Sequence, residues 1–93
     1  MAKKVHRLKT WPEYFAKVKL GEKTFEVRKD DRFFQVGDEL LLEEFVPEGY
    51  YPEDEKQEPY LTGNICHRKI TYILRGGEFG IEKGFVVLGL LII

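Results

Sequence analysis

The residue types best suited to binding or catalysis form one short segment, residues 21–28, with the sequence GEKTFEVR. It brings an ammonium, a carboxylate and a guanidinium together at Lys23, Glu26 and Arg28. Arg28 offers a planar fork for a phosphate or a base edge, and Lys23 offers a point charge. Glu26 could orient these cations or accept from an exocyclic amine of a base. A plain surface ion pair between Glu26 and Arg28 is the simpler alternative, and it would add little stability.

Residues 24–28 alternate between polar and apolar side chains, which predicts a strand. The apolar positions, Phe25 and Val27, are expected to face the core. The polar positions would then share the opposite face, and they are Thr24, Glu26 and Arg28. We therefore expect the active side chains of the segment to line up on one face of the strand.

Three further side chains could join this group. His6 and Lys9 belong to an apolar and basic alternation near the N-terminus, and they would add a group that titrates near neutral pH and a second cation. His6 could equally be an ordinary hydrogen-bonded histidine. Arg32 follows the motif strand, where it could contact a phosphate or pair with Asp30 or Asp31.

A helix from Pro12 to Leu20 is expected just before the segment. Thr10 with a Glu three residues later matches the capping box, and Gly21 stands where a left-handed residue would end the helix. Apolar residues follow at helical spacing, and they are Trp11, Tyr14, Phe15 and Val18. Trp11 and Tyr14 could stack on a base, but this spacing favours packing in the core.

Four other segments have the apolar patterns of strands, and they are residues 5–8, 39–45, 62–74 and 85–93. Residues 46–59, rich in proline and acids, predict a mobile acidic surface loop. One helix and about five strands in 93 residues predict a single α+β domain over residues 1–93. We expect a small, strongly twisted β-barrel with the N-terminal helix over one end.

Charge is unevenly distributed along the chain. Residues 1–32 carry ten Lys and Arg against five acids, whereas residues 33–62 carry one against nine. A local phosphate contact near the N-terminal third is compatible with this pattern, but a long polyanion would be repelled by the middle third. Mixed charge also simply keeps a small domain in solution.

Composition argues against several classes of protein. The single cysteine, Cys66, cannot form an internal disulfide, and with His67 it falls short of a zinc site. The chain start lacks the apolar run of a secretory signal, and the longest apolar stretch, residues 85–93, is too short to span a bilayer as a helix. We therefore expect a cytoplasmic protein without a metal, a cofactor or a membrane partner. The oligomeric state stays open, since an apolar terminal strand at a sheet edge could dimerise.

The pattern Gly-x-Lys-x-x-Glu-x-Arg resembles the signature of the ASCH domain, a PUA-like fold implicated in RNA-linked functions. The stretch HRLKTWPEYFAKVKLGEKTFEVRKDDRFFQVGDELLLEEF is also similar to small ASCH-like proteins of bacteria and phages, as are YLTG, RKITYI and FGIEKGFVVL. The resemblance implies a PUA-like barrel. It also implies that Lys23, Glu26 and Arg28 line a cleft between the helix and the barrel.

Three functions follow as alternatives. The favoured one is a non-catalytic module that binds RNA or a nucleotide in this cleft. The second is a small amidohydrolase, because one ASCH-like group deacylates a modified cytidine such as N4-acetylcytidine with a Lys, a Thr and a Glu. Lys23 matches that Lys, but Glu26 occupies the position of the Thr and Thr24 lies two residues earlier. The third is a protein-interaction domain that docks a partner through Tyr50 and Tyr51.

Overall fold

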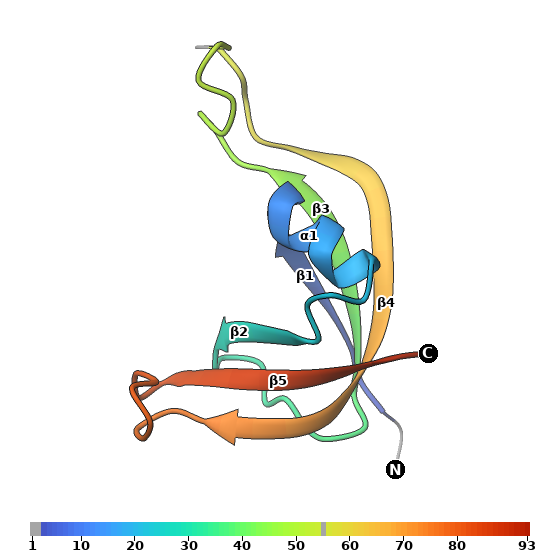
Figure 1. The fold of residues 1–93 in the computed structure, drawn as a ribbon, viewed down its shortest axis with the longest axis vertical. Coiled ribbons are helices and arrows are strands. Elements are labelled where there is room, and N and C mark those ends of the chain that lie inside the picture. The colour runs from blue at the N-terminus through green and yellow to red at the C-terminus, as the bar shows by residue number, and fades with distance from the viewer. Residues whose placement is uncertain (1–2, 55) are drawn as a thin grey trace.

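Five strands form one sheet that curls into a half-barrel, and a short helix packs on its inner face (Figure 1). This computed structural model describes residues 3–54 and 56–93, so the first two residues and residue 55 of the acidic loop lie outside it. The elements are β1 Val5–Thr10, α1 Pro12–Lys19, β2 Phe25–Lys29, β3 Glu39–Val46, β4 Tyr60–Arg75 and β5 Phe85–Ile92. The α+β class is confirmed, as are five strands and one helix among the described residues.

The strands run in the order β1-β3-β4-β5-β2. β1 pairs with β3 in parallel, and the other neighbours are antiparallel. β4 changes register between Ile70 and Tyr72, and this bulge lies where its pairing passes from β3 to β5. Because a bulge bends a strand and increases its twist, β4 can serve both halves of the curled sheet. β1 and β2 are left as the two edges of an open seam.

The core lies between α1 and the concave face of the sheet. Phe15 and Val18 of α1 are buried there, together with Phe34 from the loop before β3. The strands add alternate residues to the same cluster, and these are Leu8, Leu40, Leu42, Cys66, Ile70, Val86 and Leu88. None of the described helices is long and apolar enough to cross a membrane.

The sequence predicts the C-terminal end of α1 correctly but not its N-terminal cap. Gly21 has a φ of 81°, and the Gly21 and Glu22 amides donate to the carbonyls of Val18 and Lys17 at 3.0 Å each. This is the Schellman arrangement, so the predicted glycine end is confirmed. The predicted capping box is wrong, because the N-cap is Trp11 and no side chain caps the helix. Thr10 belongs to β1 instead.

The acidic segment between β3 and β4 projects from one end of the sheet (Figure 1). Its internal framework depends on Gln57, which is buried. The Gln57 amide nitrogen donates to the Pro47 carbonyl at 2.8 Å, and its oxygen accepts from the Tyr51 amide at 3.2 Å. The neighbouring Tyr50 ring lies 6.5 Å from the Trp11 ring, so the segment also contacts the start of α1.

Candidate functional site

β2 presents the opposite face to the one that its alternation predicts. Glu26 is only 4% exposed, whereas Phe25 and Val27 are 44% and 51% exposed. The prediction that the apolar positions face the core is therefore wrong. Glu26 points to the concave interior because two cations there offset the cost of burying its charge. Phe25 and Val27 lie on the outer face, and their register partners in β5 are Gly89 and Val87.

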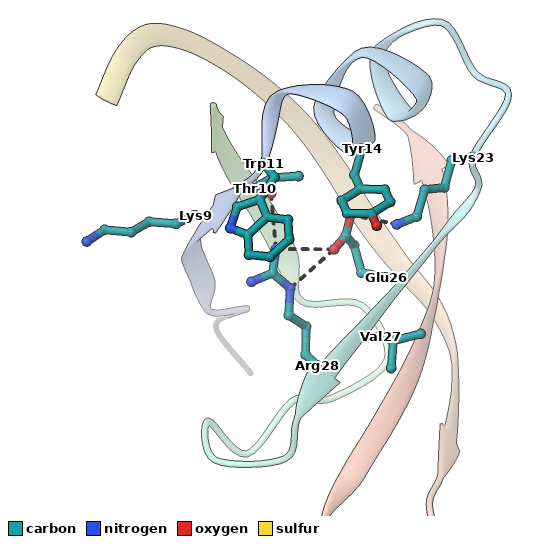
Figure 2. A pocket seen from close by; sticks show the side chains of 8 residues that line it. All are labelled: Lys9, Thr10, Trp11, Tyr14, Lys23, Glu26, Val27 and Arg28. Carbon is teal, nitrogen blue, oxygen red and sulfur yellow. Dashed lines mark hydrogen bonds and ion pairs between the residues drawn. The ribbon is translucent and has the colours of Figure 1, made fainter. Parts of the chain in front are cut away.

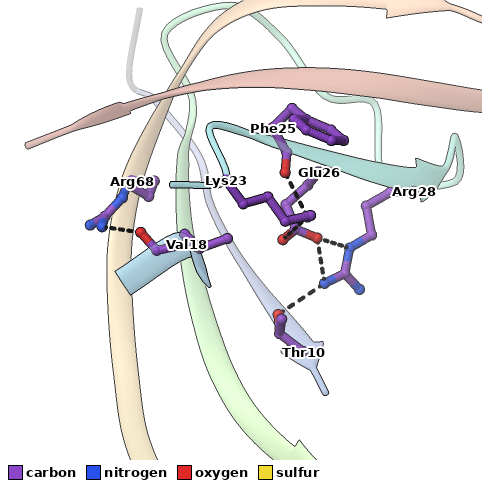
Figure 3. A network of polar contacts seen from close by, with 7 residues as sticks. All are labelled: Thr10, Val18, Lys23, Phe25, Glu26, Arg28 and Arg68. Atoms are coloured by element: carbon purple, nitrogen blue, oxygen red, sulfur yellow. Dashed lines mark hydrogen bonds and ion pairs between the residues drawn. The ribbon is translucent and has the colours of Figure 1, made fainter. Parts of the chain in front are cut away.

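A polar network is built around the Glu26 carboxylate (Figure 3). Lys23 Nζ donates to Glu26 Oε1 at 3.0 Å, and Arg28 Nε donates to Glu26 Oε2 at 3.2 Å. Arg28 Nη2 also donates to Thr10 Oγ1 of β1 at 3.0 Å. Lys23 Nζ makes a second bond, to the Phe25 carbonyl, at 2.7 Å. The three polar side chains of the motif are thus held by one another and by β1.

A cavity of about 360 Å³ opens over this network, between α1 and β2 (Figure 2). This volume suits a small ligand. Its lining residues are Lys9, Thr10, Trp11, Tyr14, Lys23, Glu26, Val27 and Arg28. The structure therefore brings together four of the expected binding residues, and they are Lys9, Lys23, Glu26 and Arg28.

Trp11 and Tyr14 form the aromatic wall of the cavity. Their ring centroids are 6.2 Å apart with an interplanar angle of 25°, and the residues are 47% and 45% exposed. The expectation that both pack in the core is wrong. The predicted apolar stripe of the helix has two environments. Phe15 and Val18 pack in the core, whereas Trp11 and Tyr14, nearer the helix start, line the cavity.

Arg68 fixes the helix that carries this wall. Its side chain is buried, and its Nη2 donates to the Val18 carbonyl at 2.9 Å near the end of α1 (Figure 3). A cation is favourable at a helix C-terminus because the peptide dipoles leave it partly negative. Sequence reasoning missed Arg68, which carries no local signal, and it also missed Thr10, whose hydroxyl matched a cap.

Three of the expected site residues lie elsewhere. His6 is buried in a 2.8 Å contact between its Nε2 and Asp38 Oδ2. Arg32 Nη1 donates to the Arg7 carbonyl at 3.1 Å, outside the cavity lining. Thr24, the hydroxyl proposed for a hydrolase, is exposed and does not line the cavity either.

The cavity favours an anion beside a flat apolar group. Lys23 and Arg28 bring two positive charges against the one carboxylate of Glu26, whereas the Lys9 side chain points away from them (Figure 2). The Lys23 ammonium also lies over the Phe25 ring at 4.9 Å, and Lys9 Nζ over the Phe45 ring at 4.7 Å. No cluster of His, Cys, Asp or Glu that could hold a metal ion occurs in residues 3–54 and 56–93.

Comparison with curated proteins found no match to this chain. Comparison with protein families found one that covers nearly all of it, from the first residue of β1 to Leu90 near the end of β5, and that includes every residue of the cavity. Residues 5–90 match the family described as "Domain of unknown function (DUF3850)", and the chain therefore belongs to that family.

Proposed function

We propose that this chain is a non-catalytic, ASCH-like and PUA-like module that binds a nucleotide, either free or as a single residue of RNA, in the cavity between α1 and β2. The observation that carries the proposal is the position of Arg28. Its guanidinium is oriented by Glu26 and Thr10 and stands in the same cavity as the aromatic wall of Trp11 and Tyr14. Phosphate and base would each find a partner there.

The contacts within the cavity indicate which residues would bind the phosphate and which would bind the base. Arg28 and Lys23 remain partly exposed although both pair with Glu26, so each keeps donors for an anionic group. Lys9 of β1 also lines the cavity, but its ammonium points away from these two cations and lies over the Phe45 ring, so it is not part of the expected phosphate contact (Figure 2). Trp11 and Tyr14 supply flat apolar surface for a base. The resemblance to the ASCH signature supports the same assignment, and no cofactor is needed for it.

The acidic segment favours a short ligand. Tyr50 of this segment lies beside Trp11 at the start of α1, with the two ring centroids 6.5 Å apart. Acidic side chains occur in the same segment, among them Glu48, Glu53 and Asp54. A polynucleotide that continued from the cavity towards this segment would meet like charge. We therefore expect contact with one or a few nucleotides.

The hydrolase alternative retains Lys23, and beside it Glu26 stands at the position of the Thr in that ASCH-like group. Lys23 Nζ and Glu26 Oε1 are 3.0 Å apart in the cavity, which suits a pair that activates water. Thr24, the nearest hydroxyl to that position along the chain, is not part of the cavity lining. Product analysis with N4-acetylcytidine distinguishes this alternative from simple binding, because only a hydrolase releases acetate.

The direct test uses the single tryptophan of the chain as a reporter, since Trp11 lines the cavity. Nucleoside 5′-monophosphates and short single-stranded RNAs are titrated while its fluorescence is followed. We expect a saturable change, and Arg28→Ala should weaken binding about 10- to 100-fold, the range for a charge-assisted contact. The matched control is Arg32→Ala, which removes an arginine outside the cavity and should leave affinity within about twofold.

Two results would contradict the proposal. Equal losses in Arg28→Ala and Arg32→Ala would indicate diffuse electrostatic attraction in place of a site. Release of acetate from N4-acetylcytidine that depends on Lys23 and Glu26 would replace the binding module with an enzyme.

A further inference from the structure

The hydrogen bonds at the two ends of β2 show which of its main-chain N–H and C=O groups point towards β5 and which point away from it. The Thr24 carbonyl accepts from the Leu90 amide at 2.9 Å, and the Asp30 amide donates to the Gly84 carbonyl at 2.8 Å. In an antiparallel pair, the residues whose main-chain groups point to the partner strand alternate with those whose groups point away. The even-numbered residues of β2 therefore bond to β5, and the odd-numbered residues point to the open seam.

Two further contacts agree that the odd-numbered main-chain groups of β2 point away from β5. The Phe25 carbonyl accepts from Lys23 Nζ at 2.7 Å, and the Lys29 carbonyl accepts from the Asp31 amide at 3.0 Å. Both odd-numbered carbonyls thus find partners on the side away from β5. Val27 lies between them, and its register partner in β5 is Val87, which forms the non-bonded type of pair.

Val27 is left with an unused donor and an unused acceptor. β2 is the last strand of the sheet, so no further strand lies beyond it in the described part of the chain. Neither the Val27 N–H nor its C=O is bonded to a side chain within residues 3–54 and 56–93. Because both groups point away from β5, they point to the side of β2 on which α1 lies in Figure 1. Val27 itself is one of the residues that line the cavity (Figure 2).

We propose that the Val27 N–H and C=O read the edge of a heterocyclic base in this cavity, as a matched donor and acceptor. The ligand class is a ring that carries a hydrogen-bond acceptor next to a donor, as on the Watson–Crick edge of every nucleobase. A ligand of this class would satisfy both unpaired main-chain groups at once, since it offers an acceptor to the N–H and a donor to the C=O.

This inference rests on the proposed function and makes it more specific. Arg28 and Lys23 would attract any phosphate, whereas Val27 would distinguish a base with a free edge from one whose ring nitrogen is blocked. Phe25 cannot take this role, since its carbonyl is already bonded to Lys23. Val27 is therefore a specificity-determining residue that acts through its backbone.

Hydrogen exchange of individual amides, measured by NMR, first tests which amides of β2 are bonded to β5. In the free protein, the Glu26 and Arg28 amides should exchange slowly because they bond to β5, and the Val27 amide should exchange faster. Protection of Val27 that disappears on dilution would mean that this edge pairs with a second copy of the chain, which would overturn the inference.

Ligand titration then tests recognition itself. The four nucleoside 5′-monophosphates are compared, and the tightest is matched with its ring-nitrogen-methylated form, N3-methyl for pyrimidines and N1-methyl for purines. We expect methylation to weaken binding about 5- to 10-fold and the unmethylated nucleotide to protect the Val27 amide. Val27→Pro should cause a similar loss, because the donor that it removes faces away from β5 and takes no part in the β2–β5 ladder. Val27→Ala retains the main-chain pair and serves as the side-chain control.

The outcomes separate this inference from the proposed function. If nucleotides bind through Arg28 but the methylated form binds equally well and Val27 exchange is unchanged, the edge-reading role is wrong and the binding module stands. If no nucleotide binds, both fail. The methylated ligands decide the question even if Val27→Pro does not fold.

Discussion

Arg28 Nη2 donates to Thr10 Oγ1 at 3.0 Å, and this one hydrogen bond spans the open seam between the two edge strands of the sheet. β1 and β2 lie at opposite ends of the strand order and form no ladder with each other. The guanidinium that we assign to the ligand is therefore oriented from both sides. Glu26 holds it within β2, and Thr10 holds it from β1.

Thr10→Val should weaken nucleotide binding without unfolding the protein. The substitution keeps the shape of the side chain but removes the acceptor, so Arg28 loses one of its two orienting partners. A hydrogen bond of this kind contributes about 0.5–1.5 kcal/mol, which corresponds to a roughly 2- to 10-fold loss of affinity. Thr10→Ser retains the hydroxyl and should restore binding. Tryptophan fluorescence titration measures all three proteins, and equal affinity for Thr10→Val and wild type would show that Thr10 does not position Arg28.

Glu26→Ala should destabilise the domain by about 2 kcal/mol, because it leaves Lys23 and Arg28 close together without their shared carboxylate. Urea unfolding measures the loss. Glu22→Ala is the matched control, since Glu22 forms an exposed ion pair with Lys17 and should cost less than about 0.5 kcal/mol. Similar losses in the two variants would mean that burial of the Glu26 network has no special energetic role.

The sequence predicts the elements well because each carries its own local signal. The strand of Thr24 to Arg28 comes from alternation, and Gly21 marks the helix end because few other residues adopt a positive φ. Lys23, Glu26 and Arg28 could be identified as one group because they are close along the chain. That grouping needed no knowledge of the fold.

Features that depend on distant segments could not be predicted. Alternation shows that β2 has two faces but not which one is buried, and here the buried face contains Glu26 because Lys23 and Arg28 compensate its charge. The Thr10 hydroxyl matches a helix cap locally, and only the approach of β2 gives it Arg28 as a partner. His6 illustrates the same limit, since its partner Asp38 is 32 positions away.

Gly21→Ala should destabilise the domain by about 1 kcal/mol. The φ of 81° at this position disfavours a side chain although no neighbouring atom would clash with a Cβ. Thermal unfolding followed by circular dichroism measures the change, with Lys19→Ala in the last turn of α1 as the control. A Gly21→Ala protein as stable as wild type would show that the turn before the motif tolerates an ordinary residue.

The stability contributed by Asp38 should disappear in acid. Burial raises the pKa of the Asp38 carboxyl, but hydrogen bonds from His6 and from the Gln35 and Lys4 amides outweigh it, so that the pKa lies below its usual value. A carboxyl with a lower pKa in the folded state stabilises the fold above its unfolded pKa of about 3.9 and loses that effect as the pH falls further. Asp38→Asn should therefore be less stable than wild type at pH 5, and the difference in unfolding free energy should shrink towards pH 3. Urea unfolding at several pH values measures it, and a difference that stays constant from pH 5 to pH 3 would contradict the role of the ionised carboxylate.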